Sequence, residues 1–232
     1  MQRFQPFAGR LAIILTALSW LAVGAASPTA AQTSVPEPGG KPIAIVAFGD
    51  SLTQGYGVDP GKAFPEQLQA ALRKDGLNAT VDNAGVSGDT TTGGLSRLDW
   101  SVPQSADLVI VELGANDALR GISPEITRKN LDEILKRLTE RGQTVVFTGM
   151  LAPPNMGEDY ARRFNAIYPD LAKQYPVTFY PFFLDGVAAE PGLNQADAMH
   201  PNSEGVAVIV GRMKPVIEKA LGETAKAGAA SN

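Results

Sequence analysis

Short apolar runs alternate with stretches of helical spacing along most of this chain. Five runs have the length and continuity of strands buried in a sheet, the second being the weakest. These runs span residues 43–48, 79–82, 108–113, 144–148 and 177–180. Helical spacing is found at residues 64–74, 92–100, 124–141, 159–174 and 202–221. The alternation predicts an α/β protein, a three-layer α/β/α sandwich around a central, mainly five-stranded parallel sheet.

The strongest helix signal follows the third apolar run. Ser123 is a common N-cap residue, Pro124 suits the first helical position, and Gly142 is typical of a helix end. Between them the apolar residues recur at helical spacing. We therefore expect a long helix here, packed on the sheet.

The first 31 residues have the pattern of a secretory signal peptide. Arg3 and Arg10 precede or border an apolar run at 11–23, and small residues follow up to Ala31. The alternative is a retained membrane anchor, but the run is shorter than the roughly 20 residues of a spanning helix. We expect cleavage between Ala31 and Gln32 and export, to the periplasm in a bacterium, with no stable membrane insertion afterwards.

Three further segments follow the predicted cleavage site. Residues 32–41 contain two prolines and a Gly-Gly pair, which indicates a flexible leader. Residues 42–221 contain all five predicted strands and form the expected folded domain. Residues 222–232 are rich in alanine and glycine, and we expect a frayed tail there.

Composition excludes several classes of partner and cofactor. The chain of 232 residues has 20 basic and 24 acidic residues, and removal of two arginines with the signal peptide gives 18 − 24 = −6. This charge argues against nucleic acid or an anionic membrane as the main partner. With no cysteine and one histidine, neither a disulfide nor a usual zinc site is expected, although an oxygen-ligated ion stays open. We expect no cofactor.

Open parallel sheets bind ligands at the carboxyl ends of their strands, so the loops after the predicted strands are where we expect a functional site. The first strand is followed by the sequence GDSLT at residues 49–53. A nucleophilic serine needs such exposure beside a base, so Ser51 is a candidate nucleophile. On position alone, a helix cap is the commoner role of a serine at such a turn.

Two further loops contain groups that could stabilise an oxyanion. Gly88, after the second strand, could bring its backbone N–H close to a substrate because it has no side chain. Asn116, after the third strand, has a neutral amide donor. Each also has an ordinary explanation, Gly88 as part of a glycine-rich turn and Asn116 as a turn former beside Asp117.

The only histidine of the chain lies near the C-terminal helix, in the sequence DAMH at residues 197–200. At this spacing Asp197 can accept a hydrogen bond from one ring nitrogen of His200 while the other faces Ser51. The alternative is an ordinary exposed or core histidine near a helix start. A hydrolase working near neutral pH would have little other choice of base in this chain.

Taken in order, these loops resemble the signature blocks of the SGNH, or GDSL, hydrolase family. The blocks are GDSL at 49–52, SGD at 87–89, GAND at 114–117 and DAMH at 197–200. The resemblance extends from about residue 42 to 221. Within the family, the stretches SGDTT at 87–91 and VELGANDALRG at 111–121 are similar to bacterial arylesterases and to multifunctional acyl-CoA thioesterase I/lysophospholipase I enzymes.

A further stretch, PPNMG at residues 153–157 ahead of Tyr160 and Arg163, resembles the loop beside the acyl site in that subgroup. What the resemblance implies is a flavodoxin-like fold and a periplasmic esterase of broad acyl specificity, acting on aryl esters, short- to medium-chain acyl esters, thioesters or lysophospholipids. The partner is then a small-molecule ester or lipid. We expect a monomer, since no helix shows a long unexplained apolar stripe.

The resemblance also implies the role of each site residue. Ser51 is the nucleophile, His200 the general base and Asp197 its orienting acid, while the amides of Ser51 and Gly88 and the Asn116 side chain form the oxyanion hole. Asp50 and Asp117, which flank these residues, are expected to be structural carboxylates that accept hydrogen bonds from loop groups.

Two other functions stay open. A carbohydrate O-acetylesterase would share every catalytic residue, although the rather apolar segment 150–156 does not suit a polar sugar cleft. A non-catalytic periplasmic binding protein on a decayed hydrolase scaffold is the second, and the intact set of site residues argues against it. Nucleotide chemistry and the α/β-hydrolase fold are disfavoured, because P-loop, dinucleotide and GxSxG motifs are absent.

Overall fold

The computed structural model of the protein describes residues 40–230. The predicted signal peptide and most of the predicted leader lie outside the described residues. Five strands form one sheet in the order β2-β1-β3-β4-β5, and every neighbouring pair is parallel. This is the strand order of flavodoxin-like doubly wound sheets. The predicted fold class is therefore confirmed.

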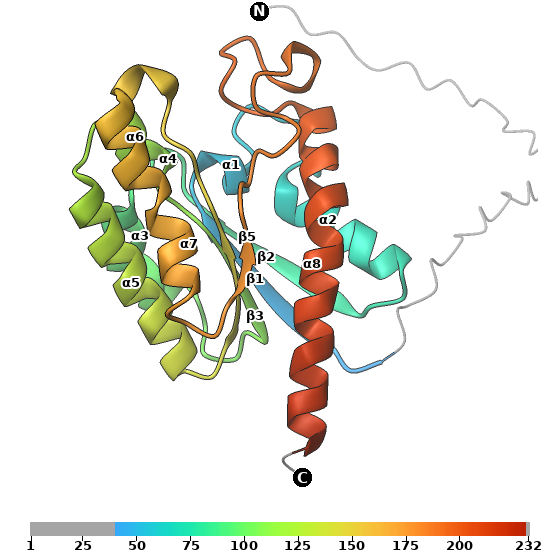
Figure 1. The fold of residues 1–232 in the computed structure, drawn as a ribbon. Helices are drawn as coiled ribbons and strands as arrows, with labels where there is room; N and C mark the ends of the chain where they lie inside the picture. The colour runs from blue at the N-terminus through green and yellow to red at the C-terminus, as the bar shows by residue number, and fades with distance from the viewer. Residues whose placement is uncertain (1–39, 231–232) are drawn as a thin grey trace, which may run out of the picture. The chain divides into compact units, whose positions relative to one another are not determined.

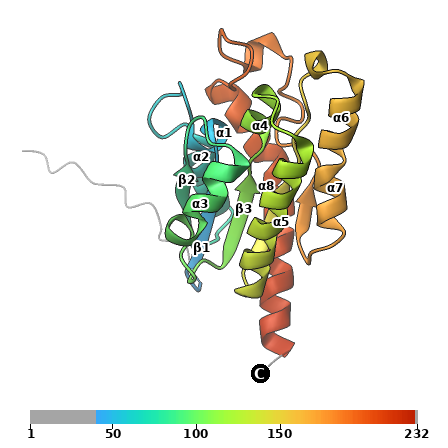
Figure 2. The same ribbon diagram turned by 90° about the vertical axis from the view of Figure 1, so that its left-hand side faces the viewer.

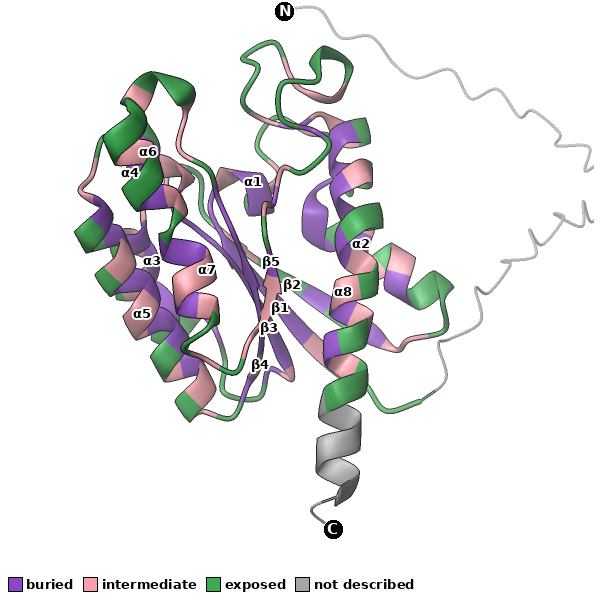
Figure 3. Ribbon diagram, viewed as in Figure 1, coloured by how far each residue is buried: buried purple, intermediate pink, exposed green. Residues whose placement is uncertain are grey.

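The strands are short, and those at the centre of the sheet are the most buried (Figure 3). They are β1 (Ile43–Gly49), β2 (Ala79–Gly85), β3 (Leu108–Glu112), β4 (Thr144–Thr148) and β5 (Thr178–Tyr180). Each coincides with an apolar run of the sequence. β2 continues beyond the predicted end at residue 82, because its backbone keeps pairing with β1 up to the partners Gly49 and Gly85.

Helices cover both faces of the sheet (Figures 1 and 2). On one face α2 (Phe64–Lys74) packs against α8 (Ser203–Ala230). The other face is covered by α3 (Thr91–Ser101), α5 (Pro124–Glu140), α6 (Glu158–Asn165) and α7 (Ile167–Ala172). Two short helices, α1 (Ser51–Gln54) and α4 (Ala115–Leu119), follow β1 and β3 directly. The apolar faces of both helical layers close a core around the sheet.

The helix expected at residues 159–174 is divided into α6 and α7. The division falls at Ala166, shortly before Pro169. A proline at this position has no N–H for the carbonyl of Asn165, and its ring would clash with that carbonyl in a continuous helix. Apolar spacing continues across the break, which explains why the sequence pattern indicated one helix.

The last helix begins as expected and ends later than expected. The Asn202 side chain accepts a hydrogen bond from the backbone N–H of Gly205 at 2.9 Å, which caps the first turn of α8. The helix then continues past Leu221 to Ala230, through residues that we expected to be frayed. Alanine, glutamate and lysine in this stretch are good helix formers. In the described part of the chain, no helix combines the length and apolar character needed to cross a membrane.

The strand order fixes where a ligand can bind. The chain moves from β1 outward to β2, then returns to place β3 on the other side of β1. Loops leaving β1 and β3 therefore separate at the carboxyl edge of the sheet, which is where doubly wound sheets bind their ligands. Ser51 and Asn116 both lie directly after these two strands.

Candidate active site

Ser51 is the first residue of α1, immediately after β1. Its side chain is half-buried, and its Oγ lies 2.9 Å from Nε2 of His200. The preceding residue, Asp50, caps the short helix, since its Oδ1 accepts the N–H of Leu52 at 3.0 Å. The serine itself is therefore not the cap, and its hydroxyl is directed toward an imidazole. This geometry is that of a nucleophile beside its base.

His200 is oriented by Asp197 from the same loop. Nδ1 of the ring lies 2.7 Å from Oδ2 of Asp197. The other carboxylate oxygen, Oδ1, accepts the backbone N–H groups of Met199 and His200, each at 3.0 Å. These hydrogen bonds, from the backbone and ring of His200 and then from Met199, lower the pKa of Asp197 to about 2. The carboxylate is thus ionised wherever the imidazole could act as a base.

The loop that carries His200 is attached to the segment after α1. Nε2 of Gln195 donates to the carbonyl oxygens of Tyr56, at 2.7 Å, and Pro201, at 2.9 Å. The Tyr56 ring lies against the His200 ring with centroids 4.8 Å apart. These contacts hold the imidazole in front of Ser51. The sequence pattern did not indicate a role for either Gln195 or Tyr56.

Asn116 lies in the first turn of α4, and its amide is oriented by Asp50. Nδ2 of Asn116 donates to Oδ2 of Asp50 at 2.9 Å. An amide nitrogen has two hydrogens, so one is left for a substrate oxygen. Asp50 is buried, and this burial raises its pKa to about 6. Asp50 thus accepts hydrogen bonds from loop groups, as expected. One of these groups is the side chain of Asn116, the predicted oxyanion donor.

Gly88 lies in the turn after β2, in the left-handed region with φ +78°. Any residue with a side chain would be strained in this conformation. Its carbonyl oxygen accepts a hydrogen bond from Nη2 of Arg120 at 2.7 Å, which links this turn to the end of α4. The turn after β2 and the end of α4, which follows β3, are therefore joined at the carboxyl edge of the sheet.

Asp117 is a structural carboxylate, as expected. It is fully buried and accepts hydrogen bonds from the backbone and the hydroxyl of Thr91, at 2.8 and 2.5 Å. The Thr127 hydroxyl also donates to it, at 3.1 Å. These three bonds join α4 to α3 and α5, and neither Thr91 nor Thr127 is a candidate catalytic residue.

Arg97 and Glu112 are two buried ionisable residues for which the sequence motifs indicated no role. The guanidinium of Arg97, in α3, donates to the Gly49 and Ala84 carbonyls, each at 2.8 Å, and to Asp89 at 2.6 Å. It thereby fixes the carboxyl ends of β1 and β2 relative to each other. A signal for Glu112 existed in the sequence, because an acid ends an otherwise wholly apolar strand.

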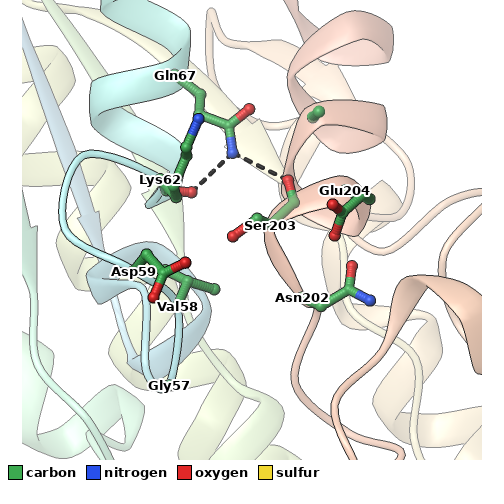
Figure 4. A pocket seen from close by; sticks show the side chains of 9 residues that line it. Gly57, Val58, Asp59, Lys62, Gln67, Asn202, Ser203 and Glu204 are labelled. Carbon is green, nitrogen blue, oxygen red and sulfur yellow. Dashed lines mark hydrogen bonds between the residues drawn. The ribbon is translucent and has the colours of Figure 1, made fainter.

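A hollow of about 540 Å³ lies beside this site, between the segment after α1 and the start of α8 (Figure 4). Its lining is mixed in charge and includes Asp59, Lys62 and Glu204. Gln67 spans it by donating to the carbonyls of Lys62 and Ser203. None of the predicted site residues lines the hollow, so it is not where Ser51 and His200 meet. Among the residues that the structure describes, no group of acids and histidine could hold a metal ion.

Known proteins with similar sequences and structures identify the class. A model described as the GDSL-like Lipase/Acylhydrolase family matches residues 47–208. An arylesterase of Vibrio mimicus is 40% identical over 161 residues, which are 69% of this chain and 80% of that protein. A thioesterase 1/protease 1/lysophospholipase L1 of Escherichia coli is 37% identical over 161 residues, 69% of this chain and 76% of that protein.

Among solved structures, the crystal structure of AlinE4, an SGNH-hydrolase family esterase, has 48% sequence identity and a TM-score of 0.66. The alignment covers 78% of this chain and 98% of that chain. The present chain therefore belongs to the GDSL-like lipase/acylhydrolase family. It is a carboxylic ester hydrolase, and the family resemblance found in the sequence is confirmed.

Proposed function

We propose that the chain hydrolyses carboxylic esters through an acyl-enzyme on Ser51, with His200 as general base and Asp197 as the acid that orients it. The observation that supports this proposal is a pair of consecutive hydrogen-bond contacts. Ser51 Oγ lies 2.9 Å from His200 Nε2, and His200 Nδ1 lies 2.7 Å from Asp197 Oδ2. This is the geometry by which an imidazole activates a serine hydroxyl.

In the first half of the proposed reaction, His200 Nε2 takes the Ser51 proton while Oγ forms a bond to the substrate carbonyl carbon. The tetrahedral intermediate collapses, the bond to the leaving oxygen or sulfur breaks, and His200 gives the proton to the leaving group. In the second half, His200 removes a proton from water as water attacks the acyl carbon. The acid leaves, and Ser51 regains its proton.

The proposed oxyanion hole consists of the backbone N–H groups of Ser51 and Gly88 and the Asn116 side chain. Support comes from the amide orientation of Asn116, whose nitrogen is fixed by Asp50, and from the φ of +78° at Gly88. Preorganised neutral donors of this kind stabilise the negative oxygen that develops in the transition state.

The proposed substrate is an ester with an apolar acyl or aryl group. Large apolar side chains are exposed on α4 and on loops that leave the carboxyl edge of the sheet or lie beside His200; they are Tyr56, Val86, Leu119, Leu151 and Met199. Such a surface suits acyl chains better than the polar rings of an acetylated sugar. The names of the relatives, arylesterase and thioesterase/lysophospholipase, support the same substrate class.

The test is hydrolysis of p-nitrophenyl esters of two, four, eight and twelve carbons by the purified full chain, with acetylated sugars in parallel. We expect turnover that rises beyond the acetyl ester, and fluorophosphonate labelling of the wild type. Ser51→Ala should lose both, whereas Ser96→Ala, which removes a hydroxyl from the exposed face of α3, should keep both. Preference for acetylated sugars would favour the O-acetylesterase. No labelling and no turnover in a folded wild type would favour a binding protein.

We also propose that the chain is exported, with cleavage before Gln32, and that the mature protein is a monomer. The support is the charged, apolar and small-residue order of residues 1–31. Expression of the full chain in a bacterium should yield periplasmic protein that starts at Gln32, by mass spectrometry, and elutes as a monomer. Uncleaved protein in the membrane fraction would contradict this proposal.

A further inference from the structure

Glu112 is a fully buried acid in contact with the turn that carries the proposed nucleophile. It is the last residue of β3, is paired in register with Gly49 of β1, and has no exposed surface. A Cβ added at Gly49 would lie 2.6 Å from Glu112 Oε2 and closer still to the Thr53 hydroxyl. The absence of a side chain at Gly49 therefore creates the space in which the Glu112 carboxyl lies. An acid is costly at such a position unless it is bonded.

The Glu112 carboxyl bonds the turn on both sides of Ser51. Its Oε2 accepts the hydroxyl of Thr53 at 2.8 Å and the backbone N–H of Asp50 at 3.3 Å. Asp50 in turn accepts Leu52 and Asn116. A continuous series of hydrogen bonds thus runs from the end of β3, through the Ser51 turn, to Asn116 on the loop that follows β3.

The carboxyl groups of Glu112 and Asp50 act directly on each other's pKa, and a hydrogen bond between two carboxyl groups requires one proton between them. Oε1 of Glu112 is buried and accepts no hydrogen bond from the described residues, so it is free to carry that proton. Burial, followed by repulsion from Asp50, raises the pKa of Glu112 well above its usual range. Both Asp50 oxygens already accept N–H groups, so the proton belongs on Glu112 and the negative charge on Asp50.

We propose that Glu112 is a positioning residue, which fixes the Ser51 turn relative to Asn116 by accepting from Thr53 and the Asp50 N–H and by donating a hydrogen bond to the Asp50 carboxylate. Glu112 touches no substrate. It acts through Asp50 on the Ser51 N–H and the Asn116 amide, two of the proposed donors to the substrate oxygen. The inference rests on the proposed function, because it gives Ser51 and Asn116 the roles assigned above.

The surrounding charged and titratable groups support the neutral form of Glu112. Arg97 of α3 donates to the nearby Gly49 carbonyl and pairs with Asp89. Buried Tyr168 of α7 and Asp117 of α4 add no positive charge. The electrostatic effect of His200 is to lower the pKa of Asp50. Within residues 40–230, no cation is hydrogen-bonded to Glu112. An ionised Glu112 would therefore be repelled by Asp50 without compensation.

The test compares Glu112→Gln and Glu112→Leu with the wild type in p-nitrophenyl ester hydrolysis. Glutamine can donate to Asp50 with its amide nitrogen and accept from Thr53 with its oxygen, so kcat should stay within about threefold, less than the loss of one hydrogen bond. Leucine does neither, so kcat should fall about 10²-fold, the effect of a lost oxyanion donor, with KM nearly unchanged. Affinity for a boronic acid that bonds Ser51 should fall in the same proportion.

Gln143→Leu is the matched control. Gln143 is also buried at a strand end and donates to the Pro103 and Ala106 carbonyls, near the opposite edge of the sheet. This variant should lose stability and keep kcat. If Glu112→Leu does not fold, Thr53→Val replaces it. That variant removes one partner of Glu112 and should lower kcat about 3- to 10-fold, comparable to one hydrogen bond.

The proposal is overturned if Glu112→Leu, or Thr53→Val in its place, keeps the kcat of the wild type. It is also overturned if Glu112→Gln is as slow as Glu112→Leu. Activity would then require an ionised Glu112 rather than its hydrogen bonds. All comparisons are made against a wild type that labels with fluorophosphonate and turns over. An inactive wild type would instead refute the proposed function.

Discussion

At the scale of single residues, the site depends on which donors and acceptors of each polar group are not used by structural hydrogen bonds. Asn116 uses one amide hydrogen on Asp50 and keeps the other. Asp197 uses one carboxylate oxygen on two backbone N–H groups and the other on the His200 ring. In each case a structural partner orients a group that the proposed reaction needs.

Asn116→Ala should therefore be slow although folded. Loss of one oxyanion donor typically lowers kcat about 10²- to 10³-fold. The same change leaves Asp50 with one partner fewer, which should cost about 1–3 kcal/mol of stability. Steady-state kinetics and urea denaturation measure the two effects separately. A variant with full kcat and a normal circular dichroism spectrum would refute the role assigned to Asn116.

At the scale of elements, the carboxyl ends of β1 and β2 are held together by a side chain from a helix. Arg97 of α3 bonds a carbonyl of each strand and the Asp89 carboxylate, and its guanidinium carbon lies 4.3 Å from the centre of the Phe48 ring. Both charged partners are largely buried, with 7% and 14% of their side chains exposed. A planar fork is needed for such a set of acceptors.

Arg97→Met should consequently lower the free energy of unfolding by about 3–5 kcal/mol, because it leaves Asp89 buried without its partner. Arg162→Met is the control, since Arg162 pairs with Asp159 on the surface of α6. An exposed pair of this kind is worth about 0–1 kcal/mol. Urea unfolding curves measure both. Equal effects of the two substitutions would show that the Arg97 fork does not hold the strands.

Strands and long helices followed from apolar periodicity, because burial imposes a period on every element that packs against the core. The helices α1 and α4 were not predicted, since four and five residues are too few to show a period. The break between α6 and α7 follows from Pro169, whose effect on the backbone outweighs continuous apolar spacing.

At the scale of the whole molecule, the buried acid pair links stability to pH. Glu112 ionises near its ordinary pKa of 4.5 in the unfolded chain, and its folded pKa is raised well above this value. Between the two values the folded state binds the extra proton, so the free energy of unfolding falls as pH rises. Asp50 acts in the same direction between 3.8 and about 6. The acid pair therefore contributes less to the stability of the fold at neutral than at acidic pH.

Glu112→Gln should remove the Glu112 part of this dependence at pH values above 4.5. One proton corresponds to about 1.4 kcal/mol per pH unit, so the variant's slope of unfolding free energy against pH should be less negative by about that amount. Chemical denaturation at a series of pH values measures the slope. If wild type and variant have the same slope, Glu112 is already ionised in the folded protein.

The sequence by itself determined the fold class, the hydrolase family and the residues that the motifs contain. Apolar periodicity and motif order are local properties, and both can be seen in a linear chain. Sequence alone also indicated that Asp197 could orient His200, because the two are only three residues apart in the chain.

Only the tertiary structure decided which distant groups meet. Glu112 bonds Asp50 and Thr53 across 62 and 59 residues, and Ser51 meets His200 across 149. Their proximity results from the strand order, which places β1 beside β3, and from burial, which makes an unbonded carboxyl costly. A single acid at the end of an apolar strand indicates that such a partner must exist, but the packing of the whole sheet selects it.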